Sequence, residues 1–210
     1  LLIGGAAIFF AAGVRLWMFV AVGVAGLAAM PLAWQMLHDY QRKRVLTFLD
    51  PETDPLGSGY HILQSKIALG SGGMFGKGFL QGSQSHLNFL PEKQTDFIFT
   101  MLAEEFGLAG SLLVLALYAA VLAYCLAIAI TAKSQFGRLL ALGITVTFFL
   151  YVFINMAMVM GLIPVVGIPL PLVSYGGTAI VSLMLGFGLV MCVYVHRDVM
   201  ISRHATGESL

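Results

Sequence analysis

Residues 89–107 read Phe89-Leu-Pro-Glu-Lys-Gln-Thr-Asp-Phe-Ile-Phe-Thr-Met-Leu-Ala-Glu-Glu-Phe-Gly107 and contain four of the chain's ten acidic residues. The polar part of this stretch ends at Asp96, and the next residue begins an apolar run long enough for a membrane helix. We therefore expect Asp96 at the mouth of a membrane helix, where an acid is costly unless it faces a cavity or a partner. This makes Asp96 a candidate functional residue. An interfacial side chain or a helix cap would produce the same pattern, and the sequence alone leaves these interpretations open.

The composition of the whole chain is that of a membrane protein. Charged residues make up 10% of its 210 residues and hydrophobic residues 59%, whereas a soluble domain has about 25% charged residues. We therefore expect an all-α polytopic membrane protein. The net charge of +1 gives no electrostatic basis for nucleic-acid binding. Cys125 and Cys192 lie in apolar runs and are expected to be core residues, and the five histidines lack metal-ligand spacing, so no metal site is predicted.

Hydropathy divides the chain into four regions. Residues 1–37 hold the end of one membrane helix and one full span over 16–37, and the start inside an apolar run without an initiator Met leads us to expect an N-terminal truncation. Residues 38–94 form a large loop that is expected to carry function. Residues 95–195 hold three spans, at about 97–130, 139–163 and 178–195, with a Pro- and Gly-rich connection at 164–177. Residues 196–210 form a tail.

Lysine and arginine in the short loops predict the orientation. Lys133 and Arg138 lie in the connection 131–138, Arg197 and Arg203 lie in the tail, and 164–177 has neither residue type. The positive-inside rule places the first two in the cytoplasm and the third outside. The 38–94 loop is then extracytoplasmic. We expect the uncharged 164–177 segment to pack back into the bundle, because irregular backbone at membrane depth must be buried in protein or line a cavity.

The loop contains the glycine cluster Gly70-Ser-Gly-Gly-Met-Phe-Gly-Lys-Gly78. It is not a P-loop, because Ser71 stands where the first glycine is required and Gly78 follows the lysine. The cluster favours a tight turn or a close approach of other groups, and a backbone nest for a pyrophosphate is the alternative. The basic run 42–44 is either a solvated charge run beside the membrane or a contact for anionic headgroups or a lipid pyrophosphate.

Three polar residues lie deeper in the expected spans. Glu104 follows Asp96 by eight residues, which is about 12 Å along a helix. At that depth Glu104 and Glu105 must face the bundle interior or pair with a cation, so we expect structural roles for both. Asn155 lies in the middle of a span, where an amide usually bonds a neighbouring helix.

Several blocks of this sequence resemble one family, the SEDS proteins (shape, elongation, division and sporulation; RodA, FtsW and SpoVE), and the agreement runs from about Arg42 to Arg197. The blocks are Pro91-Glu-Lys-Gln-Thr-Asp-Phe-Ile-Phe99, Asn155 with Gly161-Leu-Ile-Pro164, Gly167-Ile-Pro-Leu-Pro-Leu-Val-Ser-Tyr-Gly-Gly-Thr-Ala179, Asp50-Pro-Glu-Thr-Asp-Pro-Leu-Gly-Ser-Gly-Tyr60 and Gln64-Ser65. The residues Pro55-Leu-Gly-Ser-Gly-Tyr-His-Ile62 favour the elongation branch (RodA) over the division branch (FtsW). One departure is Gln94, where many relatives have histidine, so any proton relay through that position is in doubt.

The resemblance implies the C-terminal part of a ten-helix bundle in the bacterial inner membrane. Family members polymerise lipid II into peptidoglycan glycan strands during cell elongation, rod-shape maintenance or division, with a class B penicillin-binding protein and other elongation-complex membrane proteins. The fragment alone is expected to be inactive. The alternatives are a lipid II flippase and a scaffold that only recruits the penicillin-binding protein.

The resemblance also implies roles for single residues. The essential aspartate of the family corresponds to Asp96. The candidate substrate-binding residues are Arg42, Lys77, Gln84, Glu92 and Ser174, and a divalent cation (Mg or Mn) could assist the leaving pyrophosphate. The candidate structural residues are Glu104, Asn155, Pro171, Ser174, Tyr175, Gly176 and Gly177.

The orientation is testable by cysteine labelling of the complete protein in a cysteine-free background. A cysteine placed at Ser83 should react with a membrane-impermeant reagent added outside, because the 38–94 loop is expected there. A cysteine at Ser134, in the connection expected in the cytoplasm, is the matched control and should react only after permeabilisation. The opposite pattern would overturn the orientation.

Overall fold

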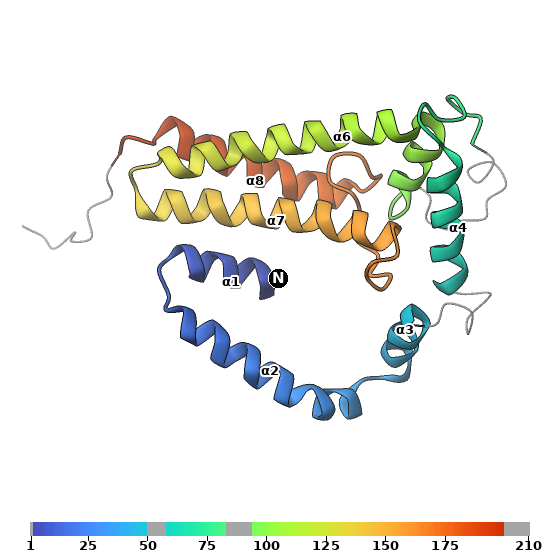
Figure 1. The fold of residues 1–210 in the computed structure, drawn as a ribbon. Helices are drawn as coiled ribbons and strands as arrows, with labels where there is room; N and C mark the ends of the chain where they lie inside the picture. Colours follow the sequence, from blue (N-terminus) through green and yellow to red (C-terminus); the bar gives the residue numbers. More distant parts are fainter. Residues whose placement is uncertain (1, 50–57, 83–93, 200–210) are drawn as a thin grey trace, which may run out of the picture.

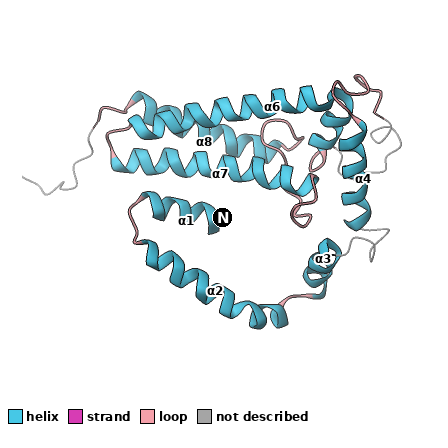
Figure 2. Cartoon of the chain, in the orientation of Figure 1, coloured by secondary structure: helices cyan, strands magenta, loops and turns pink. Residues whose placement is uncertain are grey.

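The computed structural model describes residues 2–49, 58–82 and 94–199, and the regular elements in these ranges are all helices (Figure 2). In chain order they are α1 (Leu2–Ala11), α2 (Leu16–Met36), α3 (Asp39–Leu49), α4 (Ser58–Ser71), α6 (Ile98–Thr131), α7 (Gln135–Val159) and α8 (Gly177–Val195). Four of them, α2, α6, α7 and α8, are long and apolar enough to cross a membrane. The predicted all-α polytopic class is confirmed.

Helices α6, α7 and α8 lie side by side and form a bundle (Figure 1). The short helix α1 packs against α7, and α4 runs across one end of the bundle. Helix α2 lies away from the bundle and buries none of its described side chains. The large loop thus contains two helices, α3 and α4, that the hydropathy pattern did not predict.

Helix α7 begins and ends four residues earlier than the expected span 139–163. It begins at Gln135 because the Ser134 side chain caps it, accepting a hydrogen bond from the Gly137 N–H at 3.5 Å. It ends at Val159 because Gly161 takes the left-handed conformation, with φ of 69°. The Gly161 N–H donates to Met158 O at 2.9 Å and the Leu162 N–H to Ala157 O at 2.8 Å. These two bonds form a Schellman motif, which stops the helix before Pro164.

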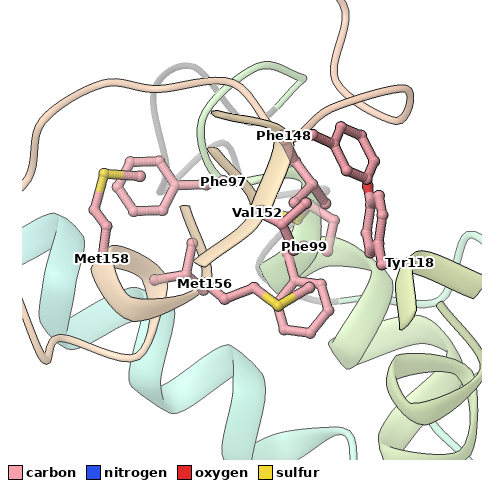
Figure 3. Packing of buried hydrophobic residues seen from close by; sticks show 10 residues of the cluster. Phe97, Phe99, Tyr118, Phe148, Val152, Met156 and Met158 are labelled. Carbon is pink, nitrogen blue, oxygen red and sulfur yellow. The ribbon is translucent and has the colours of Figure 1, made fainter. Parts of the chain in front are cut away.

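Aromatic and methionine side chains form the core at the end of the bundle that α4 crosses (Figure 3). Phe99, Met158 and Val159 in this cluster are almost completely buried. Phe148 of α7 stands edge-on to Tyr118 of α6 and Phe187 of α8, with ring centroids 5.9 and 5.3 Å apart. Such edge-to-face pairs add to the burial of large apolar surfaces, so this cluster fixes the three helices relative to one another.

A second, smaller cluster lies at the opposite end of the bundle and contains Cys125. Cys192 is exposed on α8, so its expected place in the core is wrong. Beyond this cluster, Lys133 pairs with Asp198 at 2.7 Å, and the hydrogen bond from Lys133 holds the pKa of Asp198 below its ordinary value. Both side chains are well exposed, so the pair contributes little to stability.

The glycine cluster packs against a break in α6. Gly107 is not helical (φ 66°, ψ −159°), which separates residues 98–106 from the rest of the helix. The Leu108 and Ala109 N–H groups donate to Gly73 O and Met74 O, at 3.0 and 3.1 Å. In return the Lys77 and Gly78 N–H groups donate to Glu104 O and Glu105 O, both at 3.0 Å. The loop 72–78 therefore replaces the helical hydrogen bonds that the break removes.

The contact between this loop and α6 is backbone against backbone. A β-carbon on Gly72 would lie 2.1 Å from Ala103 O, and one on Gly76 would lie 2.0 Å from Glu105 O. Such a short distance to a backbone atom can be relieved only by moving the backbone. Glycine is therefore required at both positions.

This contact predicts that Gly76→Ala destabilises the complete protein. The positive φ of 80° at Gly76 alone costs alanine about 1–3 kcal/mol, and the clash with Glu105 O adds to it. Gly70→Ala is the matched control, because Gly70 is helical and a β-carbon there meets nothing within 4 Å. Thermal unfolding in detergent should show a melting temperature several degrees lower for Gly76→Ala and equal or slightly higher for Gly70→Ala, because alanine is favoured over glycine within a helix. Equal melting temperatures would mean that the loop does not pack against α6 in this way.

Candidate functional site

The turn before α6 is held through three consecutive backbone carbonyls. The Tyr175 N–H donates to Gln94 O at 2.9 Å, the Ser174 hydroxyl donates to Thr95 O at 2.5 Å, and the Asn155 amide donates to Asp96 O at 2.9 Å. We call residues 94–96 the aspartate turn and the 161–176 segment the strap. Asn155 also donates to Ile168 O of the strap at 2.7 Å, so one buried amide joins the two. Asn155 bonds these irregular segments rather than the neighbouring helix that we expected.

The Asp96 carboxylate lies between the strap and the start of α6. A β-carbon on Gly167 would be only 3.2 Å from Asp96 Oδ2, so the half-buried carboxylate packs directly against the strap backbone. The φ of 76° at Gly167 also favours glycine there. The N-cap position belongs to Phe97, so Asp96 precedes the cap by one residue.

The strap packs into the bundle at its middle and is exposed elsewhere. Leu170, Pro171 and Ser174 are buried, Leu170 N–H donates to Ser174 Oγ at 2.7 Å, and Tyr118 of α6 donates to Pro171 O. Tyr175, by contrast, is 78% exposed. The expectation that this segment packs back into the bundle is therefore confirmed for its middle and wrong for Tyr175.

Helix α4 covers the same end of the bundle and is attached by a buried serine. Ser65 donates to Val159 O of α7 at 2.8 Å and shares a 2.9 Å hydrogen bond with the Thr100 hydroxyl of α6. Ser65 and Thr100 are completely buried. Thr100 follows Asp96 by one helical turn, so α4 is fixed beside the aspartate turn.

A large apolar cavity opens beside the strap. Its volume is about 630 Å³, and it lies between α7, α8, α1 and the strap. Its lining includes Ile8, Leu140, Pro171, Ser174, Leu183 and Phe187. Ser174, which holds the aspartate turn, thus also borders this cavity.

Two of the candidate substrate-binding cations have partners within the fold. Arg42 donates to Trp34 O at 3.0 Å and Gln35 O at 2.7 Å, which satisfies carbonyls at the end of α2. Lys77 pairs with the fully buried Glu104 at 2.7 Å, so Glu104 has the cation partner that its depth demands. Both contacts favour structural roles for these cations. The N–H groups of residues 76–78 all donate to backbone carbonyls, so these three are not available to a pyrophosphate nest.

Most of the remaining candidates belong to the strap or lie outside the described residues. Ser174 and Tyr175 hold the aspartate turn, Pro171 anchors the strap, and Gly177 begins α8 after Gly176. Gln84 and Glu92 lie outside the described residues. Gln94 contributes its backbone carbonyl to the turn, and its side chain is exposed.

Sequence reasoning gave no role to Ser65, Thr100, Tyr118 and Gly167, although Ser65 and Gly167 lie in the blocks that resemble the family. Ser65 and Thr100 are small polar residues beside apolar runs, and that signal is too common to single them out. Within the described ranges, no group of three or more His, Cys, Asp or Glu side chains is placed to hold a metal ion. Magnesium is commonly bound through one or two protein carboxylates together with substrate phosphates and water, so Asp96 would suit such a site as one ligand.

Comparison with known proteins gives consistent matches over this fold. The family model described as "Cell cycle protein" (FtsW, RodA and SpoVE) matches residues 1–199. Peptidoglycan glycosyltransferase MrdB of Escherichia coli K12 is 54% identical over 200 residues, covering 94% of this chain and 54% of the relative. Peptidoglycan glycosyltransferase RodA of Treponema pallidum is 42% identical over 179 residues, covering 84% and 41%.

The solved structures agree. A structure described as "Structural coordination of polymerization and crosslinking by a peptidoglycan synthase complex" matches with a TM-score of 0.76 and 34% identity, over 93% of this chain and 54% of that one. A crystal structure of a Thermus thermophilus rod shape determining protein RodA mutant matches with a TM-score of 0.51 and 32% identity, over 63% and 41%. The chain spans about half the length of the curated relatives it matches.

The geometry of the aspartate turn predicts that Asn155→Ala destabilises the complete protein. The substitution leaves Asp96 O and Ile168 O without their donor, and each buried unsatisfied group costs about 1–3 kcal/mol. Ser182→Ala is the control, since this exposed hydroxyl bonds only Thr178 O in its own helix. Thermal unfolding should therefore separate the two variants by several degrees. If Asn155→Ala unfolded like Ser182→Ala, the amide would not join the strap to the turn.

Proposed function

Because the chain belongs to the FtsW, RodA and SpoVE family of cell cycle proteins, we propose that the complete protein is a peptidoglycan glycosyltransferase. It polymerises lipid II into glycan strands at the outer face of the bacterial inner membrane, in cell elongation and rod-shape maintenance. The observation that carries this proposal is the Asp96 carboxylate, held at the start of a membrane-length helix through three backbone carbonyls.

Asp96 acts as the general base in this reaction. The acceptor hydroxyl attacks the anomeric carbon of a lipid-linked sugar, and the bond from that carbon to the diphosphate oxygen breaks. The bonding electrons leave with the diphosphate, and the hydroxyl proton passes to the Asp96 carboxylate. A base must be positioned within hydrogen-bond reach of the proton it takes. The fixed backbone of residues 94–96 supplies that positioning, because a carboxylate on a mobile turn would sample many directions.

A divalent cation with Asp96 as one ligand would neutralise the diphosphate, and the proton transfer to Asp96 does not depend on it.

The partner that we propose is a class B penicillin-binding protein, and the match to a structure of a synthase complex that couples polymerization and crosslinking supports it. The large loop, on this proposal, is extracytoplasmic.

The proposal predicts that Asp96→Asn abolishes strand synthesis by the complete protein. The amide keeps the size of the side chain and cannot accept the proton, and loss of a general base typically costs about 10²–10⁴-fold in rate. Glycan strands made from lipid II by purified protein in detergent are the measurement. Polymerisation in detergent also excludes a flippase or a scaffold as the whole function. Neither of them makes glycan strands, and detergent has no two sides across which lipid II could be moved. Near wild-type synthesis by Asp96→Asn would refute the assignment.

Glu104→Gln is the matched comparison for this experiment. It also neutralises a carboxylate, and it breaks the buried pair with Lys77. Removing one partner leaves the other charge uncompensated, so this variant should lose melting temperature, whereas Asp96→Asn should keep it. A large loss of stability in Asp96→Asn would mean that its inactivity reflects unfolding.

A further inference from the structure

Three cations of the 38–94 segment have described side chains, and the fold uses two of them. Arg42 donates to backbone carbonyls at the end of α2, and Lys77 pairs with Glu104. Lys66 of α4 has no hydrogen bond or ion pair with the residues that the structure describes. Of these three, Lys66 is the cation whose charge remains available to a ligand.

The exposed Lys66 side chain lies beside the end of α7. A β-carbon on Gly161 would lie 2.4 Å from Lys66 Cε and 2.8 Å from its Nζ, so the lysine lies directly across the bare backbone of Gly161. The adjacent Ser65 is completely buried and bonded to both α6 and α7. The backbone that carries Lys66 is therefore anchored at the end of α7.

Capping of α7 does not explain this lysine. The last four carbonyls of α7, at residues 156–159, already accept hydrogen bonds from Met160, Leu162, Gly161 and Ser65. A lysine that completed the cap would bond one of these carbonyls. What remains is the general attraction between a cation and the negative end of a helix, which contributes only about 0.3–1 kcal/mol at an exposed site.

Lys66 and Asp96 lie at the two ends of one short part of the strap. Lys66 contacts Gly161, and the Asp96 carboxylate contacts Gly167. Gly161 and Gly167 are six residues apart in the strap. Lys66 and the Asp96 carboxylate therefore both border this part of the strap, as a substrate with a charged group close to its reacting sugar carbon requires.

We propose that Lys66 binds the diphosphate of the lipid-linked sugar. This inference rests on the proposed function and assigns that site a residue that binds the charged part of the substrate. An ammonium group without a protein partner gains a charge-assisted hydrogen bond from a diphosphate oxygen, and it stabilises the negative charge that grows as the sugar–oxygen bond breaks.

Direct binding of farnesyl diphosphate to the complete protein tests the inference without requiring activity. Lys66→Met removes the charge and keeps most of the stem, so affinity measured by calorimetry in detergent should fall about tenfold, as expected for a lost hydrogen bond to a charged group. Lys66→Arg should retain most of the affinity. Lys133→Met, at the opposite end of the bundle, is the control and should bind as wild type. Farnesol, which has the same tail and no charge, should bind equally to wild type and Lys66→Met.

Three results would overturn the inference: wild type that does not bind farnesyl diphosphate, Lys66→Met that binds it unchanged, or Lys66→Met that unfolds at a much lower temperature than wild type. In the strand-synthesis assay Lys66→Met should raise the KM for lipid II more than it lowers kcat. A purely structural role would not produce this difference between the two kinetic constants.

An active Asp96→Asn would refute the proposed function and leave the binding result standing. An inactive Asp96→Asn with unaltered farnesyl diphosphate binding by Lys66→Met would refute this inference alone.

Discussion

The structure depends on one constraint: backbone that is not helical within a bundle of membrane helices must find partners for its N–H and C=O groups. In the described part of the chain, such segments include the loop 72–78 and the strap. The loop exchanges hydrogen bonds with both sides of the break at Gly107. The strap donates to the carbonyls of Gln94 and Thr95, and its own carbonyls at Pro171 and Ile168 accept hydrogen bonds from Tyr118 and Asn155. Each irregular segment is therefore stable because another irregular segment faces it.

These two contacts define the two ends of a short unit at the start of α6. Residues 94–106 are held by the strap at one end and by the glycine loop at the other, and Ser65 of α4 bonds Thr100 between them. A helix of this length would be marginal alone, so its direction is set by these contacts rather than by its own sequence. Because Asp96 lies on this unit, the direction of its carboxylate depends on residues far away in the sequence. That dependence is why a reacting group on a turn can be as well fixed as one within a long helix.

The sequence predicted the features that depend on composition and local pattern. The low fraction of charged residues predicted the membrane class, and the prolines of 164–177 predicted a break. The depth of Glu104 predicted either a place in the bundle interior or a cation partner, and the side chain is buried and paired with Lys77. It could not predict which segments face each other. Helix α4 was missed because its apolar residues are few and it is stabilised by packing of Ile62, Ser65 and Ala68 on the bundle. The glycine cluster was interpreted as a tight turn or a close approach of other groups. In the structure its bare backbone contacts the break at Gly107, which is about 30 residues away in the sequence, and no local pattern can reveal such a partner.

The placement of charge follows from the same constraint. Glu104 is completely buried, where an unpaired charge is costly, and Lys77 pairs with it at 2.7 Å. Arg42 is likewise committed to the last carbonyls of α2, which lack helical donors. A cation that already satisfies a buried carboxylate is a poor ligand for a second anion, because binding would leave the carboxylate uncompensated. A basic residue near a reactive carboxylate is therefore a good candidate for substrate binding only when the fold does not need its charge, and for these three side chains that condition selects Lys66.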